Sequence, residues 1–141
     1  MYNDLFPAFE SDKPEIHIGD CPDLGPILMA LAAAKNGAVF YETARLKIKE
    51  SDRGTAMAEE LAKFNVSVSL EENMISVEKS DLRAPVLPLC GHNDHRIVMS
   101  LCTLLTFTGG VIEGAEAVNK SFPDDFKCLR SLGAEVIIHE T

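Results

Sequence analysis

One stretch of ten residues concentrates much of the polar chemistry of this chain. Residues 90–99 read CGHNDHRIVM, so two histidines, an amide, a carboxylate and a guanidinium stand directly before an apolar segment. Charged clusters also stand at KESDR (residues 49–53) and at KSFPDD (residues 120–125), each before another expected helix. Acidic groups at a helix start are ordinary, because they cap free amides and suit the helix dipole. Basic groups there oppose the dipole and need another explanation.

The basic residues at these helix starts are Arg53, Arg96 and Lys120. They are well placed if an anion binds, because unsatisfied backbone N–H groups and a cation can then both reach it. Two simpler interpretations stay open: residues 49–53 form a solvated turn with internal salt bridges, and Lys120 is an ordinary surface lysine. If the turns lie at equivalent ends of neighbouring units, the three cations converge on one face.

Two further sets of side chains have chemical potential. Cys90, His92 and His95 form a Cys-x-His-x-x-His pattern, which supplies three metal donors without a convincing fourth. We expect no metal, and we expect His95 to orient its neighbours through its ring nitrogens. Asp23 precedes an apolar helix much as Asp94 does, so it is either a helix cap or a base for a bound hydroxyl.

The elements that must position these residues follow a repeated α/β pattern. Apolar spacing predicts, in order, a strand at 15–18, an apolar helix at 23–37, a strand at 38–41, an amphipathic helix at 52–64, and a hairpin with strands at 66–70 and 74–77. The first helix is apolar almost all round, so it should be buried on every side. In the 52–64 helix, Met57 and Leu61 face the core and Glu60 faces solvent.

The pattern returns in the second half of the chain. Asp94 opens a second apolar helix, Gly109-Gly110 ends it, and 111–112 is a strand. An amphipathic helix follows KSFPDDF, and 134–138 is expected to be a last strand. The two halves, about 14–80 and 81–141, therefore form a repeat with a period of about 70 residues. Helices packed against sheets in an α/β domain are the expected architecture.

Composition bounds the class of protein. The chain has 141 residues, 46% of them hydrophobic, which is enough for one domain with a core. A net charge of −9 argues against a nucleic-acid partner, so any anion must be bound locally. The sequence shows no signal peptide and no membrane span, and we expect a cytoplasmic protein. Four widely spaced cysteines suit reduced thiols, and residues 1–13 read as a connection.

Four motifs carry a resemblance to a known family. PDLGP (residues 22–26), RLKIKESDR (45–53), NDHR (93–96) and NKSFPDDF (119–126) occur in an order and spacing similar to the C-terminal part of 5-enolpyruvylshikimate-3-phosphate synthases. The resemblance implies βαβαββ units with buried helices and outer sheets. It also implies that this chain is the last two units of the second domain and lacks the N-terminal domain of the much longer enzymes.

The activity implied by the resemblance is enolpyruvyl transfer from phosphoenolpyruvate to the 5-hydroxyl of shikimate-3-phosphate, a step of aromatic amino acid biosynthesis that uses no cofactor. It proceeds through a tetrahedral intermediate with loss of phosphate. Asp23 then matches the base beside the reacting hydroxyl, and Glu50 matches the acid that exchanges a proton with the methylene carbon. Because most groups that hold the shikimate phosphate belong to the absent domain, we expect little turnover from this chain alone.

The resemblance also assigns the binding residues. Lys49 matches a contact of shikimate-3-phosphate, whereas Arg53, Arg96 and Lys120 match the cations that hold phosphoenolpyruvate. The supporting residues are His95, Asp94 and Arg45. Arg45 stands where an asparagine is frequent in the family, which leaves that contact open. Two alternatives remain: a transferase acting on UDP-N-acetylglucosamine, and a non-catalytic anion-binding relic.

Overall fold

The computed structural model describes residues 13–49 and 51–139, with only the backbone described at residue 120. Its first half contains a complete strand–helix–strand–helix–strand–strand unit. The elements are β1 (Glu15–His17), the 3₁₀ helix η1 (Pro22–Leu24), α2 (Gly25–Ala34), β2 (Ala38–Tyr41), the 3₁₀ helix η2 (Ala44–Ile48), α3 (Arg53–Lys63), β3 (Val68–Leu70) and β4 (Met74–Val77). The expected strands and helices of this half are therefore confirmed.

The second half begins in the same way. Its elements are β5 (Leu89–Cys90), α4 (His95–Thr108), β6 (Ile112–Glu113), the 3₁₀ helix η3 (Ala115–Lys120) and α5 (Asp125–Ser131). Helix α4 begins at the predicted Asp94 cap, whose side chain accepts a hydrogen bond from the Arg96 N–H, and it ends at Gly109. The φ of +75° at Gly109 explains why a glycine stands there.

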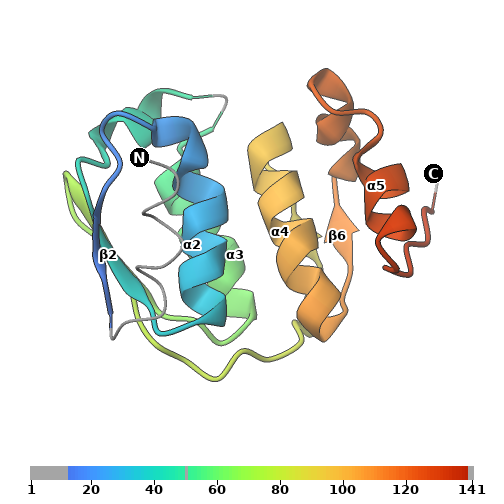
Figure 1. Cartoon of the computed structure of the whole chain (residues 1–141), viewed down its shortest axis with the longest axis horizontal. Helices are drawn as coiled ribbons and strands as arrows, with labels where there is room; N and C mark the ends of the chain where they lie inside the picture. The colour runs from blue at the N-terminus through green and yellow to red at the C-terminus, as the bar shows by residue number, and fades with distance from the viewer. Residues whose placement is uncertain (1–12, 50, 140–141) are drawn as a thin grey trace.

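Two sheets enclose the apolar helices. The first sheet has the order β1-β2-β4-β3, in which β1 and β2 are parallel and the other pairs antiparallel; β5 and β6 form a parallel pair. Helix α2 lies between the first sheet and α4, and α4 lies between α2 and β6 (Figure 1). None of the residues of α2 is exposed, as its all-round apolar sequence predicts. The fold is therefore α/β, with the apolar helices α2 and α4 inside and the sheets outside.

Three expectations about local structure are wrong. Residues 134–138 form no strand: no described strand pairs with them, so their backbone groups lack the ladder that β4 supplies to β3. Asp23 does not cap α2, because it lies inside η1 and Leu24 takes the cap position. Glu60 does not face solvent; its side chain is only 2% exposed because loop 90–94 covers it.

Two expectations concern membrane and redox context. Within the described ranges, no helix is long and apolar enough to cross a membrane. The four cysteines are all free thiols, with Cys21 and Cys102 buried and Cys90 and Cys128 exposed. The expected connection at residues 1–13 lies almost entirely outside the described residues.

Candidate functional site

The carboxylate of Asp23 is a meeting point of cations from three separate elements. Its Oδ1 lies 3.2 Å from Lys49 Nζ, at the end of η2, and 3.0 Å from Arg53 Nη1, at the start of α3. From α4, Arg96 Nη1 donates to the Asp23 main-chain oxygen at 3.4 Å, and Arg96 Nη2 lies 4.0 Å from Asp23 Oδ2. Residues far apart in the sequence therefore converge on one spot.

Asp94 is a second carboxylate of the site; it is fully buried and is joined to Asp23 through Arg53. Arg53 grips it with two nitrogens, Nε at 2.9 Å from Oδ2 and Nη2 at 3.2 Å from Oδ1. The Ser51 hydroxyl donates to Oδ2 at 2.8 Å, and the Arg96 N–H donates to Oδ1 at 3.0 Å. This pair explains why an arginine at the start of α3 is tolerated: the carboxylate that caps α4 neutralises it.

Both carboxylates are held in their ionised form. Burial alone would raise the pKa of Asp94, but hydrogen bonds from Arg53 and Ser51 outweigh it, and the pKa is lowered. Desolvation likewise opposes ionisation of Asp23, yet Lys49, Arg96 and Arg53 hold its pKa below the ordinary value. Among the described residues, three cations therefore meet two ionised carboxylates here.

The cations differ in how far solvent can reach them. The side chain of Arg53 is only 2% exposed, so it is committed to its protein partners. Lys49 is 28% and Arg96 is 41% exposed, and no described residue seals either side chain from solvent. Lys49 and Arg96 are thus the cations that an incoming anion can reach, and Arg53 supplies the charge behind them.

The remaining predicted site residues are placed less completely. His95 is the first residue of α4, and its buried Nδ1 has no hydrogen-bond partner among the described residues. Arg45 Nη1 donates to the Gly19 carbonyl at 2.9 Å, which ties η2 to the turn before Asp23. Lys120 ends η3, but its side chain lies outside the described part of the chain, as does the whole of Glu50. The roles assigned to these residues stay predictions.

Comparison with known proteins decides the family. The family model described as EPSP synthase (3-phosphoshikimate 1-carboxyvinyltransferase) matches residues 8–137. The chain belongs to this family. It is 41% identical over 130 residues to the 3-phosphoshikimate 1-carboxyvinyltransferase of Sulfurisphaera tokodaii, a match covering 88% of this chain and 30% of that protein. The enzyme of the same name from Clostridium kluyveri is 40% identical over 125 residues, covering 86% of this chain and 29% of that protein.

A solved EPSP synthase structure agrees with the fold. The EPSP synthase of Acinetobacter baumannii superposes with a TM-score of 0.72 at 29% identity, covering 82% of this chain and 28% of that one. The chain thus spans under a third of the length of these relatives. The likeness supports the α/β architecture with buried helices and outer sheets.

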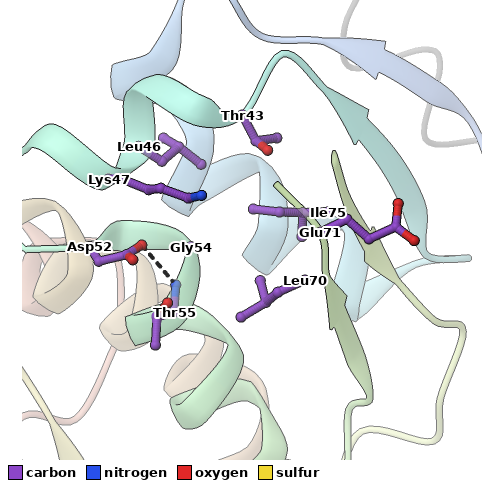
Figure 2. A pocket seen from close by; sticks show the side chains of 9 residues that line it. All are labelled: Thr43, Leu46, Lys47, Asp52, Gly54, Thr55, Leu70, Glu71 and Ile75. Carbon is purple, nitrogen blue, oxygen red and sulfur yellow. Dashed lines mark hydrogen bonds between the residues drawn. The ribbon is translucent and has the colours of Figure 1, made fainter. Parts of the chain in front are cut away.

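A small cavity in this EPSP synthase-family chain lies beside the site without belonging to it. It is enclosed by η2, the start of α3 and the β3–β4 hairpin, and Lys47, Leu70 and Ile75 are among its lining residues (Figure 2). The Thr55 N–H donates to Asp52 at its rim, which caps α3. Its volume of ≈ 30 Å³ holds little more than a water molecule. A substrate therefore does not fit there.

The Cys-x-His-x-x-His residues do not gather into one set of metal donors in the structure. Among the described residues, only Glu59, Glu60 and His92 have donor atoms close enough together to hold a metal ion. Cys90 and His95 are not part of that group. Glu60 accepts hydrogen bonds at both oxygens, from Lys63 and the Cys90 N–H at Oε1 and from His92 at Oε2.

Sequence reasoning assigned no role in the site to Ser51 or Glu60, and it considered His92 only as a metal donor. Ser51 lies within the KESDR motif, so its place between charged residues was a usable signal. Glu60 and His92 join α3 to the loop before α4, with His92 Nε2 2.7 Å from Glu60 Oε2. Nothing in the sequence marked Glu60 for such a role, because its position in the helical pattern is that of a solvent-facing acid.

Proposed function

We propose that this chain carries one half of the active site of a 3-phosphoshikimate 1-carboxyvinyltransferase and binds phosphoenolpyruvate there. The observation that carries the proposal is the convergence of Lys49, Arg53 and Arg96 on one spot in a chain of the EPSP synthase family. Phosphoenolpyruvate bears a carboxylate and a phosphate, so it needs cations from several directions. Charge-assisted hydrogen bonds contribute about 1.5–3 kcal/mol each to such binding.

In the proposed reaction, the 5-hydroxyl of shikimate-3-phosphate adds to C2 of phosphoenolpyruvate while the methylene carbon gains a proton. Phosphate then leaves as that carbon returns the proton, which restores the enol double bond on the product. Asp23 would take the hydroxyl proton, and Glu50 would exchange the methylene proton. Lys120 would complete the cations around phosphoenolpyruvate.

Substrate binding would also activate Asp23. Without a ligand, Lys49 and Arg96 share its carboxylate and keep its pKa low, which makes it a weak base. An incoming phosphate or carboxylate competes for these cations. As they turn toward the ligand, the pKa of Asp23 rises and proton transfer from the hydroxyl becomes easier.

Turnover is proposed to require the remainder of an enzyme of this family. The groups contributed by the N-terminal domain would close the other side of the cleft, and preorganisation from both sides is what lowers the barrier. Both relatives described above are named for shikimate-3-phosphate chemistry, so transfer to UDP-N-acetylglucosamine is not favoured. The cytoplasm stays the predicted location.

The first test is binding by the chain alone. Titration calorimetry with phosphoenolpyruvate should show that Lys49→Ala and Arg96→Ala each weaken binding about tenfold. Lys47→Ala is the matched control, because this exposed lysine of η2 makes no hydrogen bond or ion pair with Asp23 among the described residues. Equal effects of Lys47→Ala and Lys49→Ala would remove the specific site and leave only nonspecific charge.

The second test is catalysis. Phosphate release from phosphoenolpyruvate and shikimate-3-phosphate is measured for the chain alone and mixed with a polypeptide that supplies the N-terminal domain. Activity restored by mixing, and abolished by Asp23→Asn, is the expected result. If a folded partner restores nothing although phosphoenolpyruvate binds, the chain is an anion-binding relic.

A further inference from the structure

The loop that leads into α4 contains strained backbone. His92 and Asn93 have φ values of +53° and +54°, in the left-handed region that residues with a Cβ seldom adopt. Such conformations persist only where the surrounding structure holds them. The next residues along the chain are Asp94 and Arg96, so the interactions that hold this loop also set the directions of both.

The carboxylate of Glu60 holds the loop from the side of α3. Its Oε1 accepts from the Cys90 N–H and from Lys63 Nζ, both at 2.8 Å, and its Oε2 lies 2.7 Å from His92 Nε2. Although burial alone would raise the pKa of Glu60, these three donors lower it, so the group is an ionised acceptor. His92 therefore carries a proton on Nε2 and donates it to Glu60.

Helix α3 therefore binds the 90–94 loop at two points, through a cationic and an anionic side chain. Arg53, in its first turn, holds Asp94 at the end of the loop. Glu60, two turns later and about 10 Å along the axis, holds the beginning. Gly91 packs closely against Gly114, the residue that follows β6. A Cβ at position 91 would lie 2.7 Å from the Gly114 carbonyl oxygen. The strained residues lie between these fixed points.

We propose that Glu60 and His92 are positioning residues for the anion site. Their hydrogen bond keeps the 90–94 loop in its left-handed conformation, so that Asp94 meets Arg53 and Arg96 meets Asp23. The inference rests on the proposed function only in taking phosphoenolpyruvate as the anion. The geometry that the pair maintains is independent of the ligand.

The test separates the side chain of His92 from its backbone. His92→Gly removes the hydrogen bond but suits the positive φ, whereas His92→Gln keeps a donor at the same number of bonds from the backbone. In ¹⁵N-labelled protein, hydrogen exchange of the Arg53 Nε–H reports whether Asp94 is still in place. We expect exchange about tenfold faster in His92→Gly, because one charge-assisted bond is lost, and near the parent rate in His92→Gln.

Asn65→Gly is the matched control, since Asn65 also has a positive φ, of +72°, but lies in a turn after α3. It should leave Arg53 exchange unchanged. If His92→Gly does not fold, Glu60→Gln, which removes the charge and retains one acceptor, should give the same acceleration. A folded His92→Gly with unchanged Arg53 exchange overturns the proposal, and so does equal acceleration in His92→Gln.

Phosphoenolpyruvate titrations of the same variants keep the two proposals apart. Weaker binding in His92→Gly, rescued in His92→Gln, is expected if both are correct. If Arg53 Nε–H exchange is faster in His92→Gly but neither the parent protein nor any variant binds phosphoenolpyruvate, the proposed function is overturned and the positioning role stands. If His92→Gly binds phosphoenolpyruvate normally and its Arg53 Nε–H exchanges at the parent rate, the positioning role is overturned and the proposed function stands.

Discussion

Asp94 and Asp125 are both buried carboxylates, and their surroundings could hardly differ more. Asp94 has no exposed surface and is bound by Arg53, Ser51 and the Arg96 N–H. Asp125, in the first turn of α5, is 8% exposed, and its Oδ2 has no hydrogen-bond partner in the described part of the chain. The pKa of Asp94 is lowered by its partners, whereas burial raises the pKa of Asp125.

The two carboxylates differ in whether hydrogen-bond donors surround them. Around Asp94, donors from two helices and the turn before α3 meet the negative charge and stabilise it. Asp125 borders a small apolar cluster that includes Cys102, and burial there raises the pKa of the Cys102 thiol to about 12. A buried carboxylate is therefore kept ionised where donors surround it, whereas burial without enough donors favours its neutral form.

The largest effect expected is from Asp94→Asn. Asparagine still caps α4, so the substitution removes chiefly the negative charge that the buried Arg53 guanidinium faces at its Nε and Nη2. The free energy of unfolding should fall by about 3–5 kcal/mol in urea titrations. Asp52→Asn, at the exposed cap of α3, is the control and should change stability by less than about 0.5 kcal/mol. Similar losses in both variants would show that Asp94 acts only as a cap.

An opposite and smaller effect is expected from Asp125→Asn. A group whose pKa is raised by folding favours the folded state below its unfolded pKa and loses that contribution as pH rises through the folded value. Removing the ionisable group should therefore stabilise the protein at pH 7 by about 1–3 kcal/mol. The gain should vanish near pH 3, where the parent carboxyl is protonated as well.

The control for this gain is Asp124→Asn, at the exposed neighbouring position. It should be nearly neutral across the same pH range. The parent protein should also lose stability in acid through Asp94, because a pKa lowered by folding contributes stability above the unfolded pKa that is lost as pH falls through the folded one. Destabilisation by Asp125→Asn at pH 7 would contradict the contrast between the two carboxylates.

The smallest effect is expected from Ser51→Ala, which removes one of the several donors to Asp94. Stability should fall by about 1 kcal/mol, because Arg53 and the Arg96 N–H remain in place. Thermal and urea unfolding measure it. A loss as large as that of Asp94→Asn would mean that Ser51, rather than Arg53, keeps the buried carboxylate satisfied.

Much of the local structure could be predicted because it follows from local patterns. The apolar sequence of α2 required burial, the Asp94 cap fixed the start of α4, and alternation found the hairpin of β3 and β4. The segment 134–138 has a similar pattern but forms no strand among the described residues. A strand needs a neighbour to satisfy its backbone, and the segment's own sequence does not say whether one is present.

The sequence by itself determined that cations stand at helix starts where the dipole disfavours them, and its motifs resembled one family. Only the tertiary structure decided that Arg53 is a buried partner of Asp94 while Arg96 stays accessible beside Asp23. It also decided that Glu60 faces a loop and not solvent. The physical reason is that helical spacing fixes which side chains share a face, but only packing between distant segments decides what that face meets.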